Sequence, residues 1–478
     1  MGGADVFLRS DPGFGGIDFV SLGRTPFLQE ADTMLFHRIP ITFRRRAAAG
    51  LLSAALLLTG CGAAPQADAT AEGYDSGAQI AQATDAADTE IAPADAVHYD
   101  TSAQYGATAL TDGAALTGGT YTAQGEDESA LEASGTVTAQ VSGAVIQKTA
   151  GDATSVDDAS FRGVNAAVRV YDDATVTLTD CQVTATAGNA TGVFAYDGGT
   201  VYLDGCTVDV TGGGAGGVQV AGGGTLYGTD LTVTSASKAA IRSDRGGGTM
   251  VLDGGTYTST GTNGCPAIYS TADITVKNAV CLSQNSRAVI IEGKNSVTLV
   301  NCTLTGNDQS TKSGSVRANV LLYQSASGDA GEGTSVFSMT GGSMVCRSGA
   351  MFYCTNTASE IHLNGAALTL SADGTLLIVS AGRWGKEGRN GGSCTLEAVA
   401  QTLSGDIEVD SISALSMTLT DSQYTGAIHG QGTVNVTLGS GSTWTLTGDS
   451  SVSSLSGDLS GLQLNGYALY VGGVLYTG

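Results

Sequence analysis

The residues best suited to chemistry in this sequence form a short charged run, Arg242-Ser243-Asp244-Arg245, in a stretch that is otherwise nearly uncharged. In a repeating structure, Tyr269 and the run Glu292-Gly293-Lys294 would lie beside it on the following repeats. Aromatic faces, guanidinium groups and amides are the groups that contact sugar rings and hydroxyls. We therefore predict one surface patch that binds a glycan or a partner, formed by Phe194, Gln219, Arg242, Asp244, Arg245, Tyr269, Glu292 and Lys294.

A structural role for the same residues is the alternative. In that interpretation, Arg242 or Arg245 pairs with Asp244 and Glu292 across neighbouring repeats and fixes their register. Substituting the charged residues would distinguish the two, since a binding patch loses its ligand while a ladder loses stability.

A sequence repeat must position these side chains. Its segments start at Thr175, Thr200, Thr225, Thr249, Asp273 and Ser296, at intervals of 23 to 25 residues. Val176 and Leu178 alternate with polar residues, and this period of two indicates strands and not a helical solenoid. Each repeat has three such segments, which predicts an all-β fold: a right-handed parallel β-helix over 106–430, followed by C-terminal coils and a cap over 431–478.

Acidic and amide residues mark the turn after the first strand of each repeat. These residue types tolerate left-handed backbone geometry, so a ladder of turns is favoured over a row of calcium ligands. The residues are Asp180, Asp204, Asp230, Asp253, Asn278, Asn301 and Asn364. Cys181, Cys206 and Cys302 also recur at equivalent positions, and we interpret them as small buried hydrophobic residues.

Two stretches, 307–333 and 381–393, break the rhythm of the repeat. We expect them to be loops inserted between coils, whereas 334–370 continues the strand pattern. Insertions of this kind often shape a binding face.

Composition and charge exclude several classes of function. The 478 residues include 70 Gly and only 6 Pro, and the net charge is −24. Nucleic acid is therefore a poor partner, because the summed field repels phosphates, and a polyanion could bind only at a local basic spot.

The N-terminal region has the layout of a bacterial export signal. Arg44, Arg45 and Arg46 precede an apolar run that ends in Leu58-Thr59-Gly60-Cys61. These last four residues resemble the bacterial lipobox, which implies acylation of the Cys61 thiol and a lipid anchor on the bacterial membrane or cell surface. We expect an over-extended start over 1–33, a lipoprotein signal peptide over 34–60 and a disordered tether over 61–105.

The runs AAIRSDRGGGT, PAIYSTADITV and VIIEGKNSVTLVNCTLTGN, within 145–307, resemble right-handed β-helix surface proteins of bacteria. Those proteins share their architecture with pectate lyases, and their uncharacterised members are described as adhesin-like. The resemblance implies the fold, an extracytoplasmic location and contact with a polysaccharide or with surface glycans of host or bacterium.

Recognisable catalytic sets are missing from the sequence. Lyases of this fold use calcium-bound carboxylates with an Arg or Lys base, and hydrolases use grouped Asp acids. Asp172-Asp173 and His429-Gly430 match only fragments of a polygalacturonase pattern. We therefore predict a non-catalytic binder with no cofactor and no metal, with a polysaccharide lyase or glycoside hydrolase as the alternative and a structural spacer as the second alternative.

Overall fold

The computed structural model describes residues 106–311 and 314–478, which belong to one compact unit. The expectations for 1–33, 34–60 and 61–105, with lipid attachment at Cys61, lie outside the described residues. Among the described residues, no helix is both long and apolar enough to cross a bilayer.

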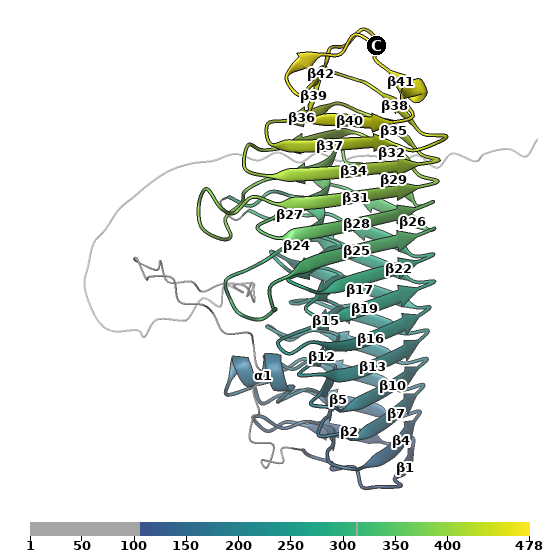
Figure 1. The fold of residues 1–478 in the computed structure, drawn as a ribbon. Helices are drawn as coiled ribbons and strands as arrows, with labels where there is room; N and C mark the ends of the chain where they lie inside the picture. The colour runs from purple at the N-terminus through teal and green to yellow at the C-terminus, as the bar shows by residue number, and fades with distance from the viewer. Residues whose placement is uncertain (1–105, 312–313) are drawn as a thin grey trace, which may run out of the picture. The chain divides into compact units, whose positions relative to one another are not determined.

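The described chain winds into a parallel β-helix, as the repeat predicts. Each full coil contributes one strand to each of three faces, so neighbouring strands in a sheet come from successive coils. Figure 1 shows the strands as stacked rungs from β1 (Ala115–Thr117) to β42 (Leu469–Val471).

We name the faces sheets I, II and III. Among the described residues, sheet I has 15 strands: β3 (Leu131–Ala133), β6 (Val168–Val170), β9 (Val193–Tyr196), β12 (Val218–Ala221), β15 (Ile241–Ser243), β18 (Ile268–Ser270), β21 (Val289–Glu292), β24 (Ala318–Tyr323), β27 (Ala350–Thr355), β30 (Thr375–Val379), β33 (Asp406–Val409), β36 (Ile428–Gly430), β39 (Ser450–Val452), β42 and β43 (Val474–Leu475).

Sheet II has 14 strands within the described ranges: β1, β4 (Thr138–Ser142), β7 (Thr175–Thr179), β10 (Thr200–Asp204), β13 (Gly224–Thr229), β16 (Gly248–Asp253), β19 (Asp273–Lys277), β22 (Ser296–Val300), β25 (Thr334–Thr340), β28 (Ala358–Asn364), β31 (Ser393–Val399), β34 (Ala414–Thr420), β37 (Thr433–Leu438) and β40 (Ser454–Gly457).

Sheet III begins with ten strands of the described chain: β2 (Thr120–Ala123), β5 (Val145–Lys148), β8 (Gln182–Ala185), β11 (Thr207–Val210), β14 (Thr232–Ser235), β17 (Thr256–Thr262), β20 (Val280–Asn285), β23 (Thr303–Gly306), β26 (Ser343–Cys346) and β29 (Ala367–Thr369). A separate set of four follows: β32 (Thr402–Ser404), β35 (Gln423–Thr425), β38 (Thr443–Thr445) and β41 (Leu462–Gln463), with the short 3-10 helix η1 (Leu459–Gly461) just before β41.

The strand register confirms the predicted repeat. Each repeat start pairs with the next one along sheet II: Thr175, Thr200, Thr225, Thr249, Asp273 and Ser296. Parallel strands lie about 4.8 Å apart, so side chains at equivalent positions form straight columns along the coil axis.

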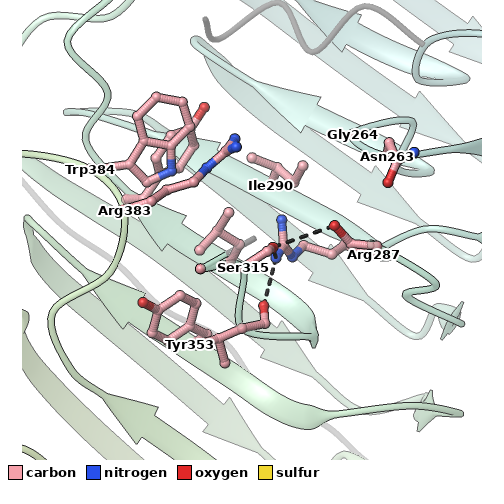
Figure 2. Close-up of a pocket in the computed structure, with 13 residues that line it drawn as sticks. Asn263, Gly264, Arg287, Ile290, Ser315, Tyr353, Arg383 and Trp384 are labelled. Atoms are coloured by element: carbon pink, nitrogen blue, oxygen red, sulfur yellow. Dashed lines mark hydrogen bonds between the residues drawn. The ribbon is translucent and has the colours of Figure 1, made fainter. Parts of the chain in front are cut away.

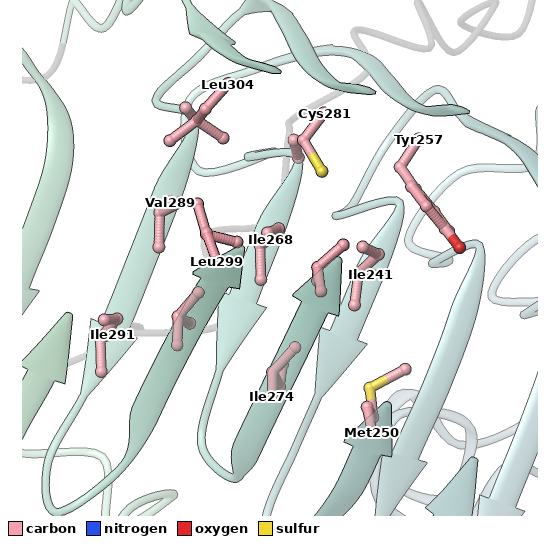
Figure 3. Close-up of a cluster of buried hydrophobic side chains, with 14 of the residues drawn as sticks. Ile241, Met250, Tyr257, Ile268, Ile274, Cys281, Val289, Ile291, Leu299 and Leu304 are labelled. Carbon is pink, nitrogen blue, oxygen red and sulfur yellow. The ribbon is translucent and has the colours of Figure 1, made fainter. Parts of the chain in front are cut away.

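Apolar side chains fill the space inside the coils. Val176 and Leu178 of β7 are fully buried, whereas their neighbours Thr175 and Thr177 point outward and are partly exposed. Figure 3 shows the aliphatic side chains of successive rungs converging in this core. Burial of apolar surface contributes roughly 25 cal/mol per Å², so each coil is stabilised by the coils stacked on it.

Three cysteines occupy the core as expected. Cys181, Cys206 and Cys302 are free thiols and are at most 1 % exposed. Their interpretation as small buried hydrophobic residues is confirmed.

The turns between sheets II and III differ in one respect from the expectation. Four of the seven predicted turn residues have φ between 50° and 54°: Asp180, Asp230, Asn278 and Asn301. The other three, Asp204, Asp253 and Asn364, end their strands, and the glycine that follows each one takes the left-handed conformation. The predicted turns are present, and the left-handed residue after each strand is the Asp or Asn itself or the glycine that follows it.

Four segments between strands lie against sheet I. The first contains the helix α1 (Val156–Arg162) and connects β5 to β6. The other three are the stretches 307–317, 324–333 and 380–392. Figure 1 shows α1 and loops projecting on the side of the stack that carries β12, β15, β24 and β27.

The prediction that 307–333 is a single loop is wrong. Six of its residues form β24, the sheet I strand of that coil, and all six are buried. The inserted segments on either side cover the outer face of β24, so its sequence lacks the alternation that marks a half-exposed strand.

No helix was expected from the sequence, because the seven residues of α1 are too few for a helical period to be recognised. The Ser155 hydroxyl caps its N-terminus by accepting a hydrogen bond from the Asp158 amide. Gly163 ends it in a left-handed conformation.

Aromatic side chains fill the core near the C-terminal end. Trp444 is fully buried and stacks on Tyr424, with 6.0 Å between the ring centroids. Beyond them, β43 pairs with β42 in the antiparallel sense and ends the run of parallel strands.

Candidate functional site

One column of side chains runs along the outside of sheet I, and we call it the outer column. Its members pair in register on successive strands: Glu132, Arg169, Phe194, Gln219, Arg242, Tyr269, Ile290, Leu321, Tyr353, Ile378, Glu408 and His429. The neighbours on either side in each strand, such as Ile241 and Ile268, point into the core. The predicted alignment of Phe194, Gln219, Arg242 and Tyr269 is therefore confirmed.

The predicted exposure of this patch is wrong. Six of its eight residues are at most 4 % exposed: Phe194, Gln219, Arg242, Asp244, Tyr269 and Glu292. Arg245 is partly exposed, and Lys294 is exposed while its stem packs beside Gly331 and Gly333. The reason is that the segments inserted between strands lie over this stretch of sheet I and supply the partners of these side chains.

Two side chains of sheet I and one from the segment before β15 hold the C-terminal turn of α1. The Gln219 amide donates to the Ser160 carbonyl (2.8 Å), and the Lys238 ammonium donates to the Ser160 hydroxyl (2.7 Å). Arg169 donates to the Arg162 carbonyl (3.0 Å). These donors satisfy groups at the negative end of the helix dipole. Burial and the nearby Arg242 guanidinium lower the pKa of Lys238 to about 8.

Two ion pairs compensate the charges of the Arg242–Arg245 run. Arg242 lies in β15 and Asp244 directly follows this strand. Their side chains pair at 2.7 Å, and both are fully buried. Arg245 pairs with Asp329 of the stretch 324–333, also at 2.7 Å, and stacks on the Phe161 ring of α1. Burial and repulsion by Asp244 raise the pKa of Asp329, while Arg245 opposes this rise.

The Glu292 carboxylate fastens the stretch 324–333 to sheet I. It accepts hydrogen bonds from the hydroxyls of Tyr269, Tyr323 and Ser325. Burial raises the pKa of Glu292, although these three hydrogen bonds oppose the rise. The structural alternative expected pairing across neighbouring repeats, whereas Arg242 pairs with Asp244 within one coil and Glu292 accepts hydrogen bonds from hydroxyl groups and holds a loop.

A second set of side chains forms an open pocket further along the outer column. We call it the aromatic pocket, and its principal lining residues are Arg287, Ile290, Tyr323, Tyr353, Arg383 and Trp384. Figure 2 shows Trp384 and Arg383 on one side of Ile290 and Arg287 on the other. The pocket therefore combines aromatic rings, an aliphatic floor and guanidinium groups.

Contacts among its own residues fix the shape of the aromatic pocket. The rings of Trp384 and Tyr323 are 5.3 Å apart, and the Arg383 guanidinium lies 4.3 Å from the Trp384 ring. On the other side, Arg287 donates to the Val316 carbonyl (2.7 Å) and pairs with Asp308 (3.1 Å). The stretch 307–317 thus holds the wall formed by Arg287, and the stretch 380–392 provides the wall formed by Arg383 and Trp384.

Sequence reasoning did not identify any residue of the aromatic pocket. The predicted insertions at 307–333 and 381–393 nevertheless indicated where to look for the pocket, because they contain three of its lining residues, Tyr323, Arg383 and Trp384. The adjacent pair Arg383-Trp384, in a chain with only two Trp residues, was the most informative feature of those insertions.

A third feature, the polar pocket, follows on the next rungs of sheet I. It is lined by Ile378, Ser380, Glu408, Asp410, His429 and Gln431, with Val409 behind them. Glu408 and His429 are adjacent members of the outer column, and both are exposed. Among the described residues, neither pocket nor any other place brings together three His, Cys, Asp or Glu side chains that could hold a metal ion.

Comparison with known families supports the architecture. Residues 142–327 match the family model described as "Right handed beta helix region". This range contains the buried pair of Arg242 with Asp244 and three residues of the aromatic pocket, Arg287, Ile290 and Tyr323. No curated protein matches the chain.

Proposed function

We propose that this chain, a right-handed parallel β-helix protein, is a non-catalytic glycan-binding protein of the bacterial surface. The observation that carries the proposal is the aromatic pocket on the outer face of sheet I. The rings of Trp384, Tyr323 and Tyr353 line it and are at most 8 % exposed, so a ligand meets only their edges. Arg383 offers an exposed guanidinium group, and Arg287, paired with Asp308, is mostly buried. Sugar rings are bound by this combination, since their C–H faces pack on aromatic rings and their oxygens accept hydrogen bonds.

The rigidity of the site supports binding. Sheet I provides Ile290, Tyr323 and Tyr353 from three consecutive strands, so their spacing is fixed by backbone hydrogen bonds. The hydrogen bond of Ser325 to the buried Glu292 and the pair of Arg245 with Asp329 fasten the neighbouring stretch 324–333. A site assembled before the ligand arrives loses little conformational entropy on binding.

Local charge supports the same proposal. The chain carries a net charge of −24, yet Arg287, Arg317 and Arg383, together with Lys386 and Arg389, lie in or near the segments that form the pocket. Asp308 compensates Arg287, and the remaining basic side chains make a basic spot on an acidic protein, which favours ligands that carry negatively charged oxygen atoms.

Surface attachment is the second part of the proposal. The lipobox-like sequence at Leu58-Thr59-Gly60-Cys61 supports acylation of Cys61 and retention on the membrane through a lipid. The stretch 61–105 would act as a tether between this anchor and the β-helix.

A glycan array tests the binding function. We expect the purified β-helix to bind a subset of glycans and Trp384→Ala to weaken that binding at least tenfold, because a buried aromatic anchor is lost. Tyr202→Ala is the matched control, since Tyr202 is an exposed aromatic residue on sheet II. Because Trp384 packs in a buried cluster, Trp384→Ala also lowers the melting temperature, and Arg383→Ala, at an exposed residue of the same pocket, should weaken binding with an unchanged melting temperature.

Two results would contradict the proposal. A flat response of the wild-type protein over a broad array would exclude glycan binding. New reducing ends or unsaturated products after incubation with polysaccharides would show the alternative, a lyase or a hydrolase.

Membrane attachment is tested separately in a bacterial host. We expect the wild-type chain in the membrane fraction with a fatty-acid label, and Cys61→Ser in the soluble fraction without the label. Membrane retention of the unlabelled Cys61→Ser protein would rule out the lipid anchor.

A further inference from the structure

Two cysteines meet inside the coils next to the aromatic pocket. Cys354 lies near the end of β27 on sheet I, directly after Tyr353. Cys394 lies near the start of β31, the sheet II strand of the next coil. Both are free thiols that belong to the core cluster and are at most 2 % exposed. They therefore approach each other from two different sheets, at the corner where the chain passes from sheet I to sheet II.

Backbone contacts bring the two cysteines together. The Ser380 amide donates to the Cys354 carbonyl (3.2 Å). Gly392, two residues before Cys394, lies so close that a Cβ atom on it would be 2.7 Å from the same carbonyl oxygen. The thiols of Cys354 and Cys394 are hydrogen-bonded to each other. A disulfide requires neighbouring backbones and side chains directed at each other, and this pair has both.

A second pair of thiols in the core is less suited to a bond. Cys181 and Cys206 are also hydrogen-bonded to each other, but they lie one above the other at equivalent positions of successive coils. Each thiol donates to a carbonyl at the end of the sheet II strand in its own coil, Cys181 to Thr179 and Cys206 to Asp204, both at 3.4 Å. A bond between them would break both interactions, so the geometry favours the pair at the corner.

The position of the corner pair in the chain gives a bond there a specific effect. The stretch 380–392 leaves sheet I, carries Trp384 of the aromatic pocket and returns just before Cys394. A bond to Cys354 would tie the end of this stretch to the strand that carries Tyr353. It would also limit the conformations of the stretch when its own contacts open.

We propose that Cys354 and Cys394 form a disulfide that fastens the stretch 380–392 to sheet I. The thiolate of one cysteine attacks the disulfide of an extracytoplasmic thiol oxidoreductase and forms a mixed disulfide, and the thiolate of the other cysteine then displaces the oxidoreductase. The two cysteines are oxidised, the oxidoreductase disulfide is reduced to two thiols, and these thiols take up the two protons that the cysteines released. The inference rests on the surface location in the proposed function, because disulfides form and persist in oxidising compartments.

The bond must form while the chain folds. In the folded protein, the hydrogen bond with Cys354 and burial raise the pKa of the Cys394 thiol well above its ordinary value, so the attacking thiolate is scarce. The core also encloses both sulfur atoms, and an oxidoreductase cannot reach them there. The same enclosure protects the finished bond from reductants.

Cell-free synthesis of the full chain tests the inference without export or a membrane. One sample contains a mixture of reduced and oxidised glutathione with a disulfide isomerase, and the other contains reduced glutathione alone. Alkylation under denaturing conditions and peptide mass spectrometry identify the linked cysteines. We expect a linked pair of Cys354 and Cys394 in the oxidised sample only, and alkylated Cys302 in both samples.

Hydrogen exchange measures the effect of the bond on the stretch 380–392. We expect amides of this stretch to exchange at least fivefold more slowly in the oxidised than in the reduced protein. Cys394→Ala should abolish this difference between the two samples. Cys302→Ala is the matched control, since Cys302 is equally buried on another coil, and it should keep the difference.

Each outcome decides the inference separately from the proposed function. Alkylation of both Cys354 and Cys394 in the oxidised sample, or a linked pair of Cys181 and Cys206 in their place, would overturn it. Equal exchange in the two samples despite a formed bond would overturn its role in fastening the stretch. Neither readout involves a glycan or the lipid anchor, so a flat glycan array or a soluble wild-type chain would contradict the proposed function and leave the bond in place.

Discussion

Glu292 illustrates how burial changes the role of a charged residue. In the sequence it is the one glutamate between residues 175 and 307, and a surface role was expected. In the structure it is fully buried among the hydroxyls of Tyr269, Tyr323 and Ser325. Burial also raises the pKa of the Tyr269 phenol, which therefore stays protonated and able to donate its hydrogen bond.

The pH dependence of stability should report the burial of Glu292. Because its pKa is raised in the folded state, protonation favours folding, and this contribution is lost as the pH rises from about 4.3, the unfolded value, through the folded pKa. We expect Glu292→Gln to remove this contribution, so the wild type should gain stability relative to the variant as the pH falls through that window. Melting curves from pH 7 to pH 4 measure the difference, and a gap that does not change with pH would contradict the assignment.

Helix α1 is stabilised by the coils beneath it more than by its own sequence. A seven-residue helix is too short to be stable alone, and its Ser160 carbonyl, Ser160 hydroxyl and Arg162 carbonyl are bound by Gln219, Lys238 and Arg169. The column that was expected to bind an external ligand thus binds a segment of the same chain.

Loss of one of these bonds should loosen α1 without unfolding the coils. Gln219→Ala removes a donor to a buried carbonyl, at a cost of about 1–3 kcal/mol. We expect amide hydrogen exchange in α1 to become at least fivefold faster, while exchange in β10 and β13 stays unchanged. Gln182→Ala, an exposed glutamine on sheet III, is the control. Acceleration throughout the coils would show that the bond supports the whole stack.

The whole molecule is a stack in which each coil depends on its neighbours. Its core is one continuous cluster from Leu110 to Leu469 within the described residues, and contacts pass from each coil to the next. Cooperative unfolding of adjacent coils is expected from this arrangement.

A cavity in one coil should therefore weaken the stack. Leu299→Ala removes a fully buried side chain of β22 and should lower the free energy of unfolding by about 2–5 kcal/mol. Thr298→Ala, on the outward side of the same strand, should change it by less than about 0.5 kcal/mol. Urea unfolding followed by circular dichroism gives both values, and similar losses for the two variants would contradict the proposed division of core and surface.

The sequence carried enough information to predict the coils and their register. Val176 and Leu178 alternate with polar residues, and the same alternation recurs at Val201 and Leu203 one coil later, so the period of two and the repeat length were both visible. The alignment of Arg242 with Tyr269 followed from the same counting. The aromatic pocket could not be predicted in this way. Arg287 and Tyr353 belong to different coils, and Trp384 belongs to an irregular loop.

The sequence by itself determined that the chain is a β-helix and which side chains share a column, because strand alternation and coil length are local properties. Only the tertiary structure decided which parts of that column are open to solvent. The path of an inserted segment depends on contacts with residues distant in the sequence, as when Arg245 pairs with Asp329 or Gln219 binds Ser160. These contacts bury the column from Gln219 and Arg242 as far as Tyr353, and the column is open to solvent at Glu408 and His429.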